Sequence, residues 1–279
     1  MSGIASAGYQ KIGNYGYDGY LVALLKHLQE AVANKWDGVV LVDGIEGSGK
    51  STLTFACAYY LDPSFSLDAI VFTPEQFMEA VDKAKPGTAI VWDEFVTGGL
   101  SDDYMSNMQK ALIKKVTMIR KKRLYLFWVL PYFFMARTYF AVARSRFLLH
   151  SATPDGIKRG YWEAWNYERK KDMYFKGKKT YDYCVPPYRR GKFGDFFKEG
   201  IIDEHAYDVK KEAAILSLTD SVDGRKQEGK FKVVAAKAVT MLSEDSRLTQ
   251  TVLADELGVH RHTIMGLLKL AKKGVKSEM

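Results

Sequence analysis

The sequence predicts an α/β fold, in which helices cover both faces of a parallel sheet, followed by a small all-α domain. Three observations predict it. Between about residues 36 and 152, short apolar runs alternate with segments of helical spacing. A glycine-rich octapeptide joins the first of these runs to a helix. From about residue 230 the apolar residues have helical spacing.

The first elements follow from caps and periodicity. A helix is expected over 18–35, with Asp18 as its N-cap and a leucine-rich face. The β-branched run 39–42 predicts a buried strand, and 51–61 has the spacing of a helix. A second strand is expected at 69–72. The following helix, through about residue 83, has Thr73 as N-cap and Pro74 in its first turn.

The remaining strands of the expected sheet lie at 88–93, 124–130 and 146–150, with helical segments near 102–119 and 133–143. Alternation of aromatic residues over 160–167 predicts an edge strand or hairpin. Residues 168–200 are rich in Lys, Arg, Tyr and Gly, so we expect irregular structure there, and a helix over 204–218.

The predicted domains follow from these elements. The first spans 1–220, with its core at about 36–152 and a basic extension over 155–204. The polar, aperiodic stretch 221–229 is interpreted as a linker, and 230–279 as the second domain.

The octapeptide Gly-Ile-Glu-Gly-Ser-Gly-Lys-Ser at 44–51 matches the pattern G-x-x-x-x-G-K-[ST]. Its glycines allow a tight turn whose N–H groups face phosphate oxygens, and the following helix adds its positive end. Lys50 can reach the terminal phosphates, and the Ser51 hydroxyl can bind Mg²⁺. We therefore expect ATP and Mg²⁺ as cofactors, held by Gly44, Gly47, Ser48, Gly49, Lys50, Ser51 and Thr52.

An acidic pair, Asp93 and Glu94, ends the strand expected at 88–93. The carboxyl ends of parallel strands meet at one edge of a sheet, so the pair is expected beside the glycine loop. We expect Asp93 to hold Mg²⁺ with Ser51, and Glu94 to act as the base that activates water. This pair favours hydrolysis over nucleotide binding alone.

With its Walker A and Walker B motifs, the region 36–152 resembles the additional-strand class of P-loop ATPases, which includes RecA-like and FtsK/HerA-like motors. The whole layout resembles ATPases of phages and mobile elements. This resemblance implies an oligomeric ATP hydrolase, in a ring or filament. An arginine finger from a neighbouring subunit would then come from Arg144 or Arg146, which precede the strand at 146–150.

The charge distribution indicates a polyanionic partner. The net charge is +8, and residues 104–154 hold ten cations but no Asp or Glu. Some of these cations are expected to face phosphates. A solvated helix face with carboxylate partners from elsewhere in the chain remains open. The best DNA-facing candidates are Arg120, Lys121, Lys122 and Arg123.

Residues 250–269 resemble a helix-turn-helix. Ala254 is small where two helices cross, and Gly258 supplies the turn. A helical bundle that contacts protein would show the same pattern. In the DNA-binding interpretation, the second helix presents to a major groove the residues His260, Arg261, His262, Thr263 and Lys269.

The chain is expected to be cytoplasmic, in the host cell if it is viral, without a membrane partner. The N-terminus lacks the layout of a signal peptide, and the two cysteines form no metal or redox motif. The apolar stretch 124–136 has 13 residues and contains Pro131, and is too short to span a bilayer.

The sequence therefore predicts a DNA-associated ATPase that moves, packages or remodels DNA. Two alternatives remain. One is a DNA-binding regulator that is switched by nucleotide, with little hydrolysis. The other is a nucleotide kinase, although the acidic pair and the DNA-binding tail argue against that class.

Overall fold

The structure is a computed structural model of the chain. It describes residues 8–95 and 112–214, together with residues 216, 251 and 265. The chain divides into two compact units, residues 1–214 and 215–279. The predicted linker at 221–229 and the helix-turn-helix residues 250–269 lie almost wholly outside the described residues. The second domain therefore remains a prediction.

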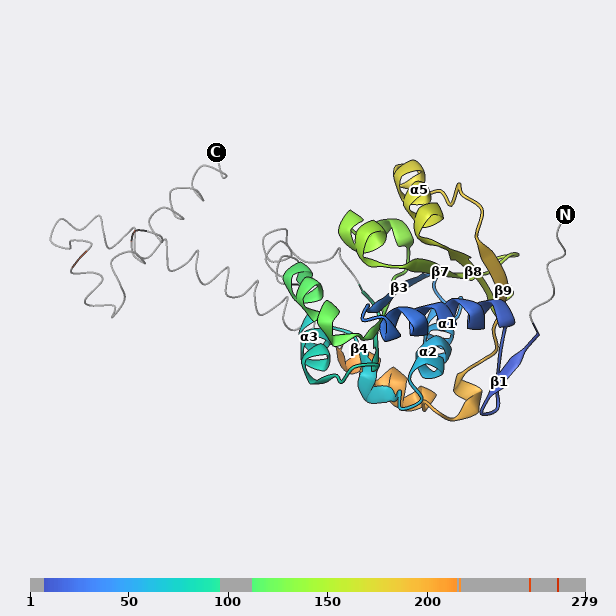
Figure 1. The fold of residues 1–279 in the computed structure, drawn as a ribbon, viewed down its shortest axis with the longest axis horizontal. Coiled ribbons are helices and arrows are strands. Elements are labelled where there is room, and N and C mark those ends of the chain that lie inside the picture. The colour runs from blue at the N-terminus through green and yellow to red at the C-terminus, as the bar shows by residue number, and fades with distance from the viewer. Residues whose placement is uncertain (1–7, 96–111, 215, 217–250, 252–264, 266–279) are drawn as a thin grey trace. The chain divides into compact units, whose positions relative to one another are not determined.

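A seven-stranded sheet, ordered β4-β5-β6-β3-β7-β8-β9, forms the centre of the first unit (Figure 1). The strands β3 to β7 are parallel. They span Gly38–Asp43, Ile70–Val71, Ala89–Trp92, Tyr125–Val129 and Phe147–Ala152. The last two strands, β8 (Tyr161–Trp165) and β9 (Arg189–Lys192), continue the sheet antiparallel. The five predicted strands are thus confirmed. Of the two predictions for residues 160–167, the hairpin is correct, because β8 pairs antiparallel with β7, and the edge strand is wrong, because β9 covers β8 on its other side.

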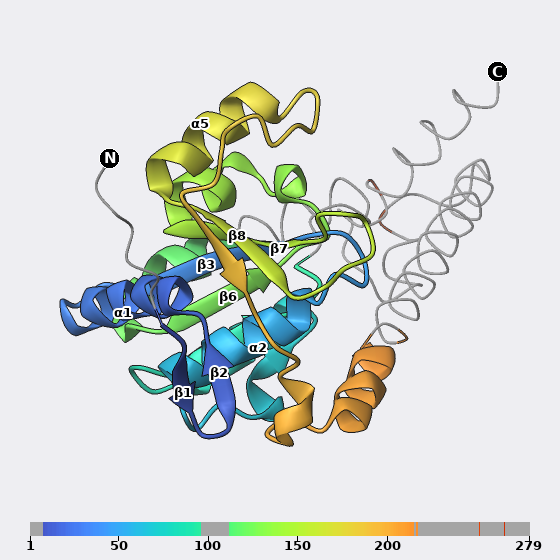
Figure 2. The same cartoon turned by 90° about the vertical axis from the view of Figure 1, so that its right-hand side faces the viewer.

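The helices cover both faces of the sheet. α1 (Gly19–Ala33) and α2 (Lys50–Leu61) pack on one face, and α3 (Pro74–Lys83) and α5 (Tyr167–Gly177) pack on the other. Figure 2 shows α2 and α5 on opposite sides of the strands. The second face also holds the helical turns 112–118, η2 (Ile119–Lys122), η3 (Phe133–Met135) and η4 (Tyr139–Arg144).

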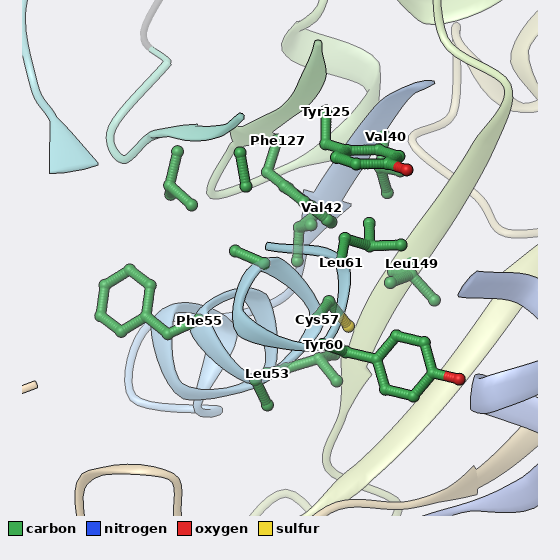
Figure 3. Close-up of a cluster of buried hydrophobic side chains, with 14 of the residues drawn as sticks. Val40, Val42, Leu53, Phe55, Cys57, Tyr60, Leu61, Tyr125, Phe127 and Leu149 are labelled. Atoms are coloured by element: carbon green, nitrogen blue, oxygen red, sulfur yellow. The ribbon is translucent and has the colours of Figure 1, made fainter. Parts of the chain in front are cut away.

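Alternate side chains of each central strand enter two separate apolar cores. On β3, Val40 and Val42 face α2, while Val39 and Leu41 face the opposite layer. Because both faces are covered, the four residues 39–42 of this strand are all hydrophobic. Figure 3 shows the first core, where Phe127 and Leu149 from the neighbouring strands lie on the side of α2 that faces the sheet.

The predicted helix caps are confirmed. The Asp18 carboxylate accepts from the N–H groups of Tyr20 and Leu21, at 2.9 and 3.3 Å. Thr73 forms a capping box with Gln76, and Pro74 occupies the first turn of α3.

The prediction of irregular structure over 168–200 was wrong. α5 occupies Tyr167–Gly177, and β9 adds the last strand of the sheet. Asn166 caps α5, and Met173 and Tyr174 anchor it in the second core. Four buried positions, spaced three or four residues apart or adjacent, are enough to hold a helix whose other residues are exposed and mostly charged.

Two smaller features complete the described residues. β1 (Gln10–Ile12) and β2 (Tyr15–Tyr17) form an antiparallel hairpin, held to α2 by the hydroxyl of Tyr17, which donates to the Ala56 carbonyl at 2.9 Å. Among the described residues, no helix combines the length and the apolar character that a bilayer crossing requires.

Candidate nucleotide-binding site

The loop 44–49 connects β3 to α2 through backbone that only glycine adopts readily. The φ angles are 145° at Gly44, 74° at Gly47 and 96° at Gly49. A Cβ atom on Gly44 would also lie 2.6 Å from the carbonyl oxygen of Ser151 in β7. Glycine is therefore required at Gly44 both for its conformation and for the space available.

The polar groups of this loop suit an anion. α2 begins at Lys50 without a side-chain cap, which leaves its first N–H groups for a ligand. Lys50 Nζ lies 2.9 Å from the Ile45 carbonyl oxygen and thus folds back over the loop. The buried Ser48 hydroxyl has no hydrogen-bond partner among the described residues. Thr52 lies in the first turn of α2 and is half-buried.

Asp93 meets the loop from the end of β5. The Ser51 hydroxyl donates to its Oδ2 atom at 3.1 Å, although 42 residues separate the two in sequence. Asp93 is 2% exposed, and this burial raises the pKa of its carboxyl group against the opposing effects of Lys211 and Tyr207. Ser51 and Asp93 thus offer two oxygen ligands of the type that Mg²⁺ prefers, and the residues fit this cofactor.

Glu94 has a left-handed backbone conformation, with φ of 62°. This conformation is uncommon for a residue other than glycine and costs about 1–3 kcal/mol. The Glu94 side chain is 41% exposed, and its charge acts on Lys50 of the loop, where burial lowers the pKa and Glu94 opposes that effect. A strained backbone at an acidic residue, next to a loop of the phosphate-binding type, is typical of a functional position.

Helix 204–214 brings two further residues, Tyr207 and Lys211, to the same place. The Tyr207 hydroxyl donates to Asp93 and lies 3.2 Å from the Ser51 hydroxyl. Lys211 Nζ lies 2.8 Å from Glu94 Oε1 and 3.9 Å from Asp93 Oδ2. Although burial lowers the pKa of Lys211, the two carboxylates outweigh burial and raise it, so the ammonium group stays charged.

Tyr207 and Lys211 were not identified from the sequence. They lie more than 100 residues from the acidic pair, and a Tyr and a Lys one helical turn apart form no known motif. Burial, followed by Asp93, raises the pKa of the Tyr207 hydroxyl, which therefore remains a donor. Tyr207 and Lys211 thus contact the two carboxylates that the sequence assigns to Mg²⁺ binding and to activation of water.

A second buried acid, Asp43 at the end of β3, fixes the strand beneath the loop. It accepts from the Phe133 N–H at 2.9 Å and from the Tyr183 hydroxyl, and His150 Nδ1 lies 2.9 Å from its Oδ1. Burial lowers the pKa of His150, but Asp43 outweighs burial and the net effect raises it. Asp43 thereby joins the ends of β3 and β7 to η3.

Arg144 and Arg146 lie at the opposite edge of the sheet. Arg144 is nearly buried and forms a bidentate pair with Asp37, with Nη1 2.9 Å from Oδ1. Arg146 Nε donates to the Asp37 carbonyl at 2.9 Å. The structure therefore does not bring either arginine to the glycine loop of its own chain. The pairing of Arg144 argues against its use as an arginine finger for a neighbouring subunit.

The basic cluster 120–123 also lies at that opposite edge, ahead of β6. Lys122 Nζ donates to the Val81 and Asp82 carbonyls, at 2.8 and 2.6 Å, and Arg123 ends η2 in a left-handed conformation. Arg120 and Lys121 are exposed. Several cations of 104–154 thus have partners elsewhere in the chain, as the alternative interpretation held. The candidates His260, Arg261, His262, Thr263 and Lys269 lie outside the described residues.

Comparison with known proteins gives little further information. No protein-family model and no curated protein matches this chain. Among solved structures, it is similar to the genome-packaging NTPase of Sulfolobus turreted icosahedral virus 2, solved in complex with AMP. The two are 12% identical, with a TM-score of 0.29, over 58% of this chain and 94% of the other. A score this low does not establish a common function.

Proposed function

We propose that the chain is a DNA-associated ATPase that uses hydrolysis to move, package or remodel DNA. One observation carries this proposal: Ser51 bonds Asp93 at the glycine loop, and Glu94 shares Lys211 with Asp93 and acts on Lys50. A nucleotide-binding loop alone needs no second acid, whereas hydrolysis needs a group that accepts a proton from water. Glu94 is the carboxylate best placed for that role.

The strand order supports the additional-strand class of P-loop ATPases. β6 lies between β3, which carries the loop, and β5, which ends in the acidic pair. That inserted strand is the feature implied by the resemblance to RecA-like and FtsK/HerA-like motors.

The residues would divide the work as follows. The loop N–H groups and Lys50 hold the phosphates of ATP, and Ser51 and Asp93 hold Mg²⁺. Bound Mg²⁺ neutralises the charge of the phosphate oxygens. Glu94 orients a water molecule and accepts its proton once Lys211 has released the carboxylate. The proposed C-terminal helix-turn-helix and the excess of positive charge supply the DNA contacts.

The test is the steady-state rate of phosphate release from ATP, with and without duplex DNA. We expect DNA to raise the rate for the full chain. Glu94→Gln should retain ATP binding but lower turnover by at least about 100-fold, since general-base catalysis contributes about 10²–10⁴. Glu79→Gln, an exposed substitution on α3, is the matched control.

Each other outcome identifies an alternative. Normal hydrolysis by Glu94→Gln would remove that residue from the role of base. Phosphate transfer to a nucleoside monophosphate would indicate a kinase. Tight ATP binding with negligible turnover and site-specific protection of DNA would indicate a nucleotide-switched regulator.

A further inference from the structure

A cavity of about 1050 Å³ lies at the edge of the sheet opposite the glycine loop. β3 runs from Gly38 at this edge to Asp43 at the other, so the two sites lie at opposite ends of the strand. The cavity is bounded by α1, by η2 and by the starts of β3, β7 and β9. The start of α1 meets β9 here, where the Arg189 guanidinium lies over the Tyr20 ring (Figure 1). The nucleotide site uses none of these residues.

The cavity has more positive than negative charge. Four arginines line it against two carboxylates, Asp37 and Glu168, and Arg144 already engages Asp37; the arginines are Arg120, Arg144, Arg146 and Arg189. Arg146 bonds only the Asp37 backbone, and among the described residues neither it nor Arg120 forms a salt bridge. Burial lowers the pKa of Arg146, Asp37 opposes this, and the neighbouring guanidinium groups lower it further. Such an arrangement is stabilised by a bound anion.

Aromatic rings line the same cavity and stack on its arginines. The ring of Trp36 is 47% exposed and lies 4.4 Å from the Arg120 guanidinium and 5.4 Å from that of Arg146. A second stack places Arg189 over Tyr188, at 4.3 Å. Exposed rings beside unpaired guanidinium groups are a surface on which unpaired bases stack while their phosphates bind the cations.

We propose that this cavity binds single-stranded nucleic acid. Trp36 and Tyr188 provide stacking surfaces for bases, and Arg120, Arg146 and Arg189 contact phosphates. A duplex keeps its base faces covered and cannot use these rings. The presence of two separate arginine–ring stacks fits a strand with several phosphates better than a single nucleotide. The proposal rests on the proposed association with DNA and assigns one of its contact surfaces.

The test is fluorescence anisotropy of the full chain with a labelled oligo(dT) of about 16 nucleotides. This length is the upper limit of the site that a single OB-fold domain covers on single strands. Trp36→Ala should weaken binding by about 5- to 100-fold, the range for loss of one stacked base. Trp36→Phe should restore most of it, since it keeps a ring. Arg120→Ala should reduce the magnitude of the slope of the logarithm of the binding constant against the logarithm of the salt concentration by about 0.7, the value for one lost phosphate contact.

Lys114→Ala is the matched control, because Lys114 is exposed near Arg120 but does not line the cavity. Binding of duplex DNA should change little in Trp36→Ala. The proposal is overturned if Trp36→Ala and Arg120→Ala bind oligo(dT) as Lys114→Ala does. It is also overturned if Trp36→Ala weakens duplex binding equally, or if a mononucleotide competes as strongly as the oligonucleotide.

The two proposals fail differently. If DNA still stimulates ATP hydrolysis while the cavity variants bind normally, the cavity assignment fails and the proposed function stands. If the wild-type chain binds neither form of DNA and its hydrolysis ignores DNA, the proposed function fails as well.

Discussion

At the scale of single residues, Gly44 shows how closely the loop is built. Its φ of 145° excludes most side chains, and a Cβ atom there would meet the backbone of β7 at 2.6 Å. Gly87 also has a positive φ, 85°, but a Cβ atom there would meet no other atom within 4 Å. The pair therefore separates backbone strain from steric conflict.

We expect Gly44→Ala to lower the free energy of unfolding by more than Gly87→Ala, which should cost about 1–2 kcal/mol. Gly44→Ala should also abolish ATP binding, because β7 and the loop must move apart. Chemical denaturation and nucleotide titration measure the two effects. Equal stability losses in the two variants would contradict the close contact with Ser151.

Lys170 is buried in α5, and burial lowers the pKa of its ammonium group to about 7. Its Nζ atom donates to the carbonyls of Ala141 and Val142, in the middle of η4. In the unfolded chain the group has its ordinary pKa of 10.5. Between these values the unfolded state binds the additional proton, so stability rises with pH across this window.

We expect Lys170→Met to melt above the wild type at about pH 6, because it removes a charge-burial penalty on the order of 5 kcal/mol. The advantage should shrink toward about pH 10, where the loss of two hydrogen bonds, about 1–3 kcal/mol, dominates. Melting temperatures across this range test it, with the exposed Lys171→Met as control. A difference that does not change with pH would contradict the low pKa.

At the scale of elements, helix 204–214 contacts both residues of the acidic pair. The Tyr207 ring packs against Phe55 of α2 and against Phe72, so the helix is fixed by its aromatic contacts. Its hydroxyl adds the contacts to Asp93 and Ser51. Mg²⁺ must compete with this hydroxyl for the same two oxygens.

Tyr207→Phe should therefore raise the affinity for Mg²⁺ and ATP by up to about tenfold, since it removes one hydrogen bond to a charged group, about 1.5 kcal/mol. The ring contacts remain, so the fold should persist. The same substitution at a tyrosine of another helix, Tyr60→Phe on α2, is the control. Unchanged affinity in Tyr207→Phe would show that the hydroxyl does not compete with the metal.

The elements also show what could be predicted from the sequence. The five parallel strands and the caps at Asp18 and Thr73 follow from local signals, because burial on both faces and first-turn N–H groups restrict the residues. The meeting of Ser51 with Asp93 follows from the rule that parallel strands end at one edge.

The features that could not be predicted depend on contacts between residues far apart in the sequence. α5 is held by a few buried side chains among many charges, and its spacing does not reveal which lysine is buried. The roles of Tyr207 and Lys211 depend on where helix 204–214 docks, which no local pattern specifies. The pairing of Arg144 with Asp37 spans 107 residues and likewise could not be predicted.

At the scale of the whole molecule, the two compact units suggest a division of labour. The described residues of unit 1–214 hold the glycine loop and both acids, and the predicted helix-turn-helix lies in unit 215–279. Deleting 230–279 should weaken affinity for duplex DNA and leave basal ATP hydrolysis nearly unchanged. Gel-shift titration and phosphate release measure these quantities. Undiminished duplex binding by the shortened chain would refute the docking role.

The proposed function carries the expectation that several subunits assemble. Light scattering should then show a larger particle when ATP and duplex DNA are both present than when either is left out. Glu94→Gln should keep the assembly for longer, because it slows hydrolysis. A particle that stays monomeric under all conditions would leave no place for an arginine finger in trans.

The most direct test is calorimetric titration of ATP with Mg²⁺ into the full chain and into Lys50→Ala. The wild type should bind one ATP per chain, with affinity that depends on Mg²⁺, and Lys50→Ala should show no binding. Heat of binding that is the same for both chains, or absent from the wild type, would contradict a triphosphate held between the glycine loop and the acidic pair.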